Sequence, residues 1–195
     1  MFIMSEIIRQ RINVLIPLLK DSDPDVRTTV AHAIEHLEVA SDIDDILHTL
    51  KTGNMGARIS AIHALGEIGG ERVLTPLVYC AGRPEDDIRA AAVESLGRLA
   101  VPSTLPVLLK SLNDRASAIQ ARAIAALSNF PPTDDLRNHL RPFLKANDGY
   151  LDAEAALALA KLKDSDSTTD IISLLSSPHS STRMAAATAL SLLPI

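Results

Sequence analysis

The stretch Ile88–Leu99, with the sequence IRAAAVESLGRL, decides the fold. Its apolar residues recur at intervals of three and four, which places them on one face of an α-helix. The helix breakers Gly82 and Pro84 precede this stretch, and the short apolar segment Val73–Ala81 precedes the breakers. The sequence therefore predicts an antiparallel pair of helices, in which a short first helix is followed by a longer second one.

Arg89 marks a position that returns along the whole chain. The equivalent residues follow one another at intervals of 31, 31, 31, 32 and 31 residues: Arg27, Arg58, Arg89, Gln120, Asp152 and Arg183. A fixed period in this range indicates a stack of like repeats rather than one globular core. We expect an all-α protein, a right-handed α-solenoid of about six antiparallel helix pairs that forms a single repeat domain over residues 1–195. The repeats are expected at approximately 5–38, 39–69, 70–100, 101–131, 132–163 and 164–195.

The remaining first helices of the pairs are predicted from short apolar segments between turn residues. These segments are Ile8–Lys20, Ile43–Leu50, Leu105–Leu112, Leu136–Lys145 and Thr169–Leu175. Pro76 and Pro106 are expected near the start of their helices, where a missing N–H is tolerated. Pro17 and Pro142 lie deeper in theirs and should kink them.

Two stretches resemble HEAT repeats: Asp21–Arg27, with the sequence DSDPDVR, and Ile88–Leu99. They are most similar to the short HEAT-like repeat named after phycobilisome bilin lyases, and the resemblance covers essentially the whole chain. It implies that an aspartate six residues before the recurring arginine joins a ladder of polar contacts between repeats. Asp21 precedes Arg27 in this way, and Asp114 precedes Gln120, whereas the other repeats carry Thr52, Arg83, Ala146 and Ser177 at this position. We therefore expect apolar packing, more than ion pairs, to hold the repeats together.

Composition excludes several classes of function. The net charge is −5 and the pI is about 5.6, which argues against nucleic-acid binding because that function normally shows a basic face. The single cysteine, Cys80, suits a reducing compartment and should be packed and inert. Residues Met1–Glu6 lack the basic region of a signal peptide, and no apolar run is long enough for a membrane span. We expect a cytoplasmic protein that requires no cofactor.

A surface for a partner follows from the helical register. If the second helices line the concave side of the array, as in other HEAT-like proteins, their outward positions form that surface. The candidate partner-binding residues are His32, Glu35, His36, His63, Glu67, Glu94, Arg98, Ala121, Ala125, Leu157, Lys161 and Met184. The first half of this set is polar and the second half is more apolar, so the second half is expected to form a docking groove for a helix or peptide of the partner.

The last stretch, Met184–Ile195, carries no charged residue. A terminal repeat of a solenoid normally has a polar outer face. The sequence therefore predicts association through this repeat, either with another protein or with a second copy of the chain.

Three hypotheses about function remain open. The leading one is a non-enzymatic scaffold that binds a protein on the concave face. The resemblance to bilin lyases implies a second, a lyase or isomerase-like enzyme or an accessory factor. The third is a metal site formed by His32, His36, His63 and Glu67, since paired imidazoles with a carboxylate suit zinc or iron. The stretch His32–His36 also matches the H-x-x-E-H signature of some zinc peptidases, but it lies inside a repeat helix, which argues against proteolysis.

Overall fold

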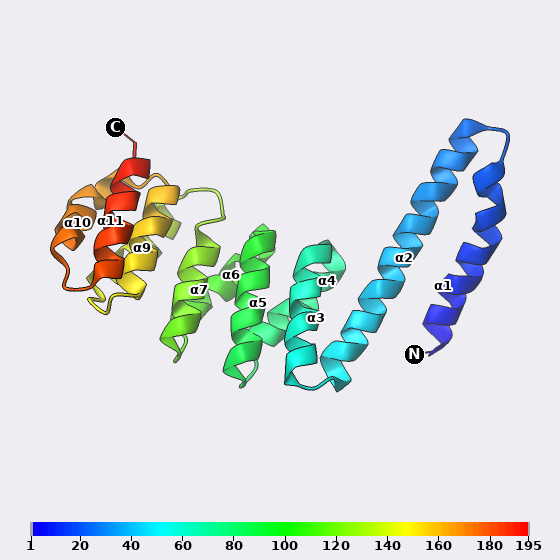
Figure 1. Ribbon diagram of the computed structural model, residues 1–195, viewed down its shortest axis with the longest axis horizontal. Helices are drawn as coiled ribbons and strands as arrows, with labels where there is room; N and C mark the ends of the chain where they lie inside the picture. The colour runs from blue at the N-terminus through cyan, green and yellow to red at the C-terminus, as the bar shows by residue number, and fades with distance from the viewer. Residues whose placement is uncertain (1, 195) are drawn as a thin grey trace. The chain divides into compact units, whose positions relative to one another are not determined.

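The computed structural model describes residues 2–194, and their side chains from residue 7 onward (Figure 1). All regular elements in this range are α-helices or short 3₁₀-helices, so the predicted all-α solenoid is confirmed. The handedness of the superhelix and the repeat boundaries stay predictions. The side chains of Met1–Glu6, on which the expectation about a signal peptide rests, lie outside the described residues, as does Ile195. The chain forms two compact units, the first ending at Ile68 and the second beginning at Gly69.

The first unit contains α1 (Phe2–Leu15), the 3₁₀-helix η1 (Ile16–Lys20), α2 (Pro24–Thr52) and α3 (Met55–Ile68). The prediction of a separate helix over Ile43–Leu50 is wrong, because this segment continues α2. Asp23 caps the start of α2 by accepting a hydrogen bond from the Asp25 N–H at 2.8 Å. No glycine or proline interrupts the sequence between Pro24 and Gly53, so nothing ends the helix earlier.

The second unit consists of successive helix pairs. Its elements are α4 (Glu71–Ala81), α5 (Asp86–Leu99), η2 (Pro102–Thr104), α6 (Leu105–Ser111), α7 (Ser117–Leu127), α8 (Asp134–Leu140), η3 (Arg141–Lys145), α9 (Leu151–Lys161), η4 (Ser165–Ser167), α10 (Thr168–Ser173), η5 (Leu174–Ser176) and α11 (Ser180–Leu192). The second helices α5, α7, α9 and α11 pack in a row, each against the next (Figure 1). Each is also packed by its own first helix: α4, α6, α8 or α10. The row therefore carries one continuous face built from four repeats.

Small residues set the spacing of this row. A Cβ atom added at Gly97 of α5 would lie 2.2 Å from the Cβ of Ala126 and 2.6 Å from its Cα, both on α7. No side chain fits there, so the two helices touch backbone to backbone at this point. On α9 and α11, small side chains also lie in the packed interior: Ala155, Ala156 and Ala186 are fully buried.

The prolines behave largely as the sequence predicts. Pro17 and Pro142 lie where an α-helix gives way to the 3₁₀-helices η1 and η3, which is the expected disruption. Pro106 is in the first turn of α6, as expected. Pro76 is inside α4, so the prediction that it lies near the start is wrong. The reason is that α4 begins at Glu71, directly after Gly70, rather than at Val73. Cys80 is buried on α4, as predicted.

In three repeats the recurring arginine joins the second helix to the turn before it. Nη1 of Arg89 donates to the carbonyl oxygens of Arg83 and Pro84, both at 2.9 Å. Arg27 and Arg183 make the same two contacts with the carbonyl groups six and five residues earlier. Gln120 reaches only the first of them, the oxygen of Asp114, at 2.7 Å. The structural role expected for this position is therefore to donate hydrogen bonds to the carbonyl groups of the preceding turn.

The polar ladder between repeats runs differently from the sequence-based expectation. The carboxylate of Asp114 pairs with Arg89 of the preceding repeat through two hydrogen bonds of 2.8 and 2.9 Å, and not with Gln120 of its own repeat. Hydrogen bonds from Arg89 hold the pKa of Asp114 below its ordinary value despite its burial. Asp21 contacts Arg27 through its backbone oxygen alone. A second ion pair, between half-buried Arg141 and buried Asp164, was not foreseen because neither residue occupies the recurring position.

Candidate functional site

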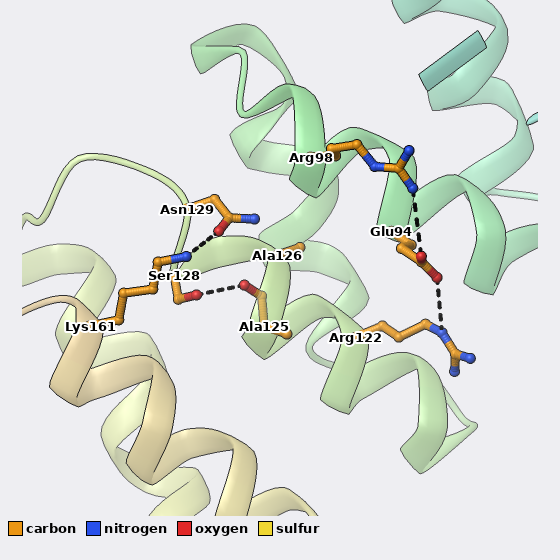
Figure 2. Close-up of a pocket in the computed structure, with 8 residues that line it drawn as sticks. All are labelled: Glu94, Arg98, Arg122, Ala125, Ala126, Ser128, Asn129 and Lys161. Atoms are coloured by element: carbon orange, nitrogen blue, oxygen red, sulfur yellow. Dashed lines mark hydrogen bonds and ion pairs between the residues drawn. The ribbon is translucent and has the colours of Figure 1, made fainter. Parts of the chain in front are cut away.

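The second unit has a hollow across α5, α7 and α9. Its volume is about 520 Å³. Eight residues line it and define what we call the Glu94 hollow: Glu94, Arg98, Arg122, Ala125, Ala126, Ser128, Asn129 and Lys161 (Figure 2). The two alanines belong to α7 and leave space between the longer side chains of the neighbouring helices. The hollow therefore brings together side chains from three successive repeats.

Glu94 lies between two arginines, as Figure 2 shows. Its Oε1 is 3.7 Å from Nη2 of Arg98, one turn along α5, and its Oε2 is 3.8 Å from Nε of Arg122 on α7. Both distances exceed the normal range of an N–H···O hydrogen bond, and all three side chains are between 42% and 49% exposed. Such solvent-exposed pairs add little to stability, so Glu94 holds the arginines only loosely.

Asn129 connects all three second helices of the hollow. Its Nδ2 donates to the backbone oxygen of Gly97 on α5 at 2.9 Å, and its Oδ1 accepts a hydrogen bond from Nζ of Lys161 on α9. The Lys161 ammonium is thereby fixed at the rim of the hollow (Figure 2). Since an ammonium has three N–H donors, Lys161 keeps donors for a ligand.

The hollow lies toward the carboxyl ends of its helices. Arg98 and Lys161 are in the last turns of α5 and α9, and Asn129 follows the end of α7. Cations are favourable at this end because the carbonyl groups there carry partial negative charge. Helix geometry thus favours the cationic side chains that line the hollow.

The structure brings four of the candidate residues together in the Glu94 hollow: Glu94, Arg98, Ala125 and Lys161. Met184 on α11 is 65% exposed and Leu157 on α9 is half-buried. Ala121 is only 2% exposed, so its assignment to the surface is wrong. It lies on α7, which α5 and α9 contact from both sides, and a side chain as short as a methyl group is covered at that edge.

The remaining candidates belong to the first unit. On α2, His32, Glu35 and His36 are exposed, and His32 Nδ1 is 3.7 Å from Glu35 Oε2 with both side chains 76% exposed. On α3, His63 is half-buried and Glu67 is exposed. In the described part of the chain, which includes these residues, no three His, Cys, Asp or Glu side chains converge as a metal ion would require. The metal-binding hypothesis gains no support from this arrangement.

The candidate set lacks four lining residues: Arg122, Ala126, Ser128 and Asn129. The register does place Asn129 at the same outward repeat position as Arg98 and Lys161, at spacings of 31 and 32 residues. Arg122 lies seven residues before Asn129, on α7, and lines the hollow because α5 and α7 are close together. These polar residues also change the expected character of the surface, which is charged rather than apolar around Ala125.

The sequence matches HEAT repeats over residues 12–97, 80–145 and 137–194. The chain belongs to the HEAT-repeat family. It is also similar to the phycocyanobilin lyase subunit alpha of Synechococcus elongatus, with 34% identity over 79 residues. This match spans 40% of the chain and 29% of the relative's length. The predicted likeness to lyase-type HEAT repeats is thereby confirmed.

Solved structures agree on the fold. The complex of CpcE and CpcF of phycocyanin lyase from Nostoc sp. PCC7120 contains a chain that matches with a TM-score of 0.65 at 18% identity, over 77% of this chain and 99% of that one. An engineered protein matches with a TM-score of 0.55 at 20% identity, over 93% and 96% of the two chains. Within residues 2–194, no helix combines the length and the hydropathy needed to cross a membrane.

Proposed function

We propose that this HEAT-repeat protein binds a protein partner on the exposed face of α5, α7, α9 and α11. The observation that carries the proposal is the Glu94 hollow, where charged side chains of three repeats surround a floor of alanines. Charged groups arrayed along a row of helices give a partner complementary contacts that set specificity. The similar lyase chain is part of a complex of two proteins, which supports a protein partner here as well.

Apolar side chains beyond the hollow complete the proposed surface. Leu157 lies on α9 and Met184 on α11, the next helix of the row, and Met184 is 65% exposed. A flexible methionine adapts to an apolar partner surface. The proposed contact therefore combines charged residues in the hollow with an apolar margin toward α11. The exposed residues of α2 and α3 predicted to bind a partner remain candidates for a further contact.

The test is affinity capture from native lysate, with the bound proteins identified by mass spectrometry. The double variant Arg98→Glu with Lys161→Glu reverses two charges of the hollow. We expect it to retain at least about 10-fold less of the specific partner than the wild type, because mismatched charges at an interface disfavour the complex. The matched control is Lys110→Glu with Lys145→Glu, which makes the same charge change at two exposed lysines outside the hollow.

Equal capture by the wild type and the hollow variant would assign partner binding to another surface. Equal loss in both double variants would show a general charge effect rather than a specific contact. Circular dichroism of each variant establishes that the helices are retained.

A second function, a bilin lyase or its accessory factor, is favoured by the 79-residue match to a phycocyanobilin lyase subunit. The lyase function requires that the chain bind a linear tetrapyrrole. Titration of phycocyanobilin with the protein should then shift the visible absorbance spectrum and saturate. An unchanged spectrum at protein concentrations up to the millimolar range would remove this function.

A further inference from the structure

We propose that the Glu94 hollow binds carboxylate groups from an acidic segment of a protein partner; this inference rests on the protein-binding function proposed above. Three of the side chains that line the hollow are cationic, Arg98, Arg122 and Lys161, and one is anionic, Glu94. The whole chain, in contrast, has a net charge of −5. The hollow is thus a site of local positive charge on an acidic protein, and it attracts anionic groups.

Glu94 occupies the place that we propose for the partner's carboxylate. Its carboxylate already lies between Arg98 and Arg122, which demonstrates that both guanidinium groups can face one carboxylate. The separations of 3.7 and 3.8 Å leave these contacts weaker than direct hydrogen bonds. A carboxylate from a partner that approaches the arginines more closely, in the two-pronged geometry that guanidinium groups favour, displaces Glu94 at little cost.

Arg122 and Lys161 are suited to receive such a group. Arg122 makes one internal hydrogen bond, from Nη1 to the oxygen of Ala118 at a long 3.4 Å, and its side chain is 42% exposed. Lys161 is held in place through Asn129, as described above. Between them lie Ala125 and Ala126, whose short side chains leave room for an incoming glutamate or aspartate. A volume of about 520 Å³ accommodates more than one such side chain.

The geometry favours a carboxylate on a protein over a small, highly charged anion such as phosphate. Phosphate sites in proteins typically use backbone N–H groups at the amino ends of helices. The Glu94 hollow instead lies toward the carboxyl ends of α5, α7 and α9, where the helix dipole opposes a compact dianion. Long arginine and lysine side chains hold a singly charged carboxylate away from those ends.

The experiment measures binding of a fluorescent, alanine-based helical peptide of about 16 residues that carries two glutamates four positions apart. The reference is the same peptide with glutamine at both positions. By fluorescence anisotropy at low ionic strength we expect the glutamate peptide to bind at least about 10-fold more tightly than the reference. Added salt should reduce this difference, since exposed charges are screened.

Variants of the full chain connect this binding to the hollow. Arg122→Gln should weaken binding of the glutamate peptide by about 5-fold or more, whereas Lys110→Gln, an equal charge change outside the hollow, should leave it unchanged. Glu94→Gln should tighten it by about 3-fold because the side chain that occupies this place loses its charge. The last variant is decisive, since a merely structural role of Glu94 would make its removal neutral or harmful.

Equal affinity for the two peptides, or weaker binding by Glu94→Gln, would overturn the inference. Inorganic phosphate provides a separate arm: if it displaces the peptide at concentrations where sodium chloride of equal ionic strength does not, the hollow is a site for free anions and the inference is wrong. Failure of the peptide to bind, together with capture of a partner that depends on Arg98 and Lys161, would remove the acidic-segment inference alone. Capture that is independent of the hollow would remove the proposed function itself.

Discussion

Arg89 and Asp152 occupy the same position in two repeats of the second unit, and they join their neighbours in opposite ways. Arg89 spans the turn before its helix and the next repeat at once, because it donates to two carbonyl oxygens and to Asp86 and Asp114. Asp152 is fully buried and too short for either task. Its Oδ1 accepts from Thr182 Oγ1 of the next repeat at 2.9 Å and from the Ala153 N–H at 2.8 Å.

The difference teaches that the recurring position is defined by its place near the start of the second helix and not by its charge. A donor at this position connects turn and neighbour through a charged network. An acceptor at the same place connects only to a hydroxyl group across the repeat boundary, and its Oδ2 is buried without a hydrogen-bond partner among the described residues. The two contacts should therefore respond oppositely to removal of their charge.

Arg89→Ala should have the largest effect. It removes the guanidinium that pairs with Asp114 and the side-chain donor of the Arg83 carbonyl, and breaking a buried ion pair in this way costs about 3–5 kcal/mol. The free energy of unfolding, from urea denaturation followed by circular dichroism, measures the loss. Arg183→Ala is the matched control, since it loses two backbone acceptors at an exposed site and should cost only about 1 kcal/mol. If both variants lose a similar free energy of unfolding, the ion pairs of Arg89 with Asp86 and Asp114 add nothing to stability.

The difference in the free energy of unfolding between the wild type and Arg89→Ala should also depend on pH. The pKa of Asp114 is lowered by its hydrogen bonds with Arg89, so the stabilisation is complete above the ordinary aspartate value of 3.8. It is lost as the pH falls through the lower value of the folded protein. The difference in stability between wild type and variant should therefore be constant near neutrality and shrink in acid.

Gly97→Ala tests the close contact between α5 and α7. The new methyl group would overlap Ala126, so α5 and α7 must move apart, at a cost of about 1–3 kcal/mol in spite of alanine's better helix propensity. Gly82→Ala is the control, because its Cβ would meet only the Tyr79 oxygen at 3.6 Å. Thermal unfolding compares the two variants. A melting temperature of Gly97→Ala above that of the wild type would contradict the close contact between Gly97 and Ala126.

Asp152→Asn should stabilise the protein by about 1 kcal/mol at pH 7, because the amide keeps an oxygen for Thr182 and Ala153 while the buried charge disappears. Asp152→Ala provides the counterpart, since it removes the acceptor as well and should destabilise. Both values come from chemical denaturation at fixed pH. If Asp152→Asn is less stable than the wild type, the carboxylate at this position is better accommodated than its contacts indicate.

Glu154→Gln should have the smallest effect, a stabilisation within about 0.5 kcal/mol at pH 7. Burial on α9 raises the pKa of Glu154, so ionisation is disfavoured in the folded protein. For a carboxyl group with a raised pKa, the penalty is absent below the ordinary value of 4.5 and develops as the pH rises through the folded value. Melting temperatures of wild type and variant should thus coincide in acid and separate toward neutrality.

Most of the fold could be predicted from the sequence because helix periodicity and the 31-residue spacing are local signals. The exception in the first unit, the continuous helix α2, arises where no glycine or proline punctuates the chain. The candidate site was predicted in part: Glu94, Arg98, Ala125 and Lys161 follow from helical register. Arg122 and the burial of Ala121 depend on how closely α7 approaches its neighbours, and that distance is set by Gly97 and other small residues in combination.

The low burial of α2 has a consequence for local unfolding. Only two of its 29 residues are buried, Val30 and Ile43, whereas eight of the 14 residues of α5 are. In a repeat protein each element is stabilised mainly by its immediate neighbours, so free energy is distributed unevenly along the chain. The amide hydrogens of α2 should therefore exchange with solvent through local openings long before those of α5, and the two helices should differ in their hydrogen-exchange rates.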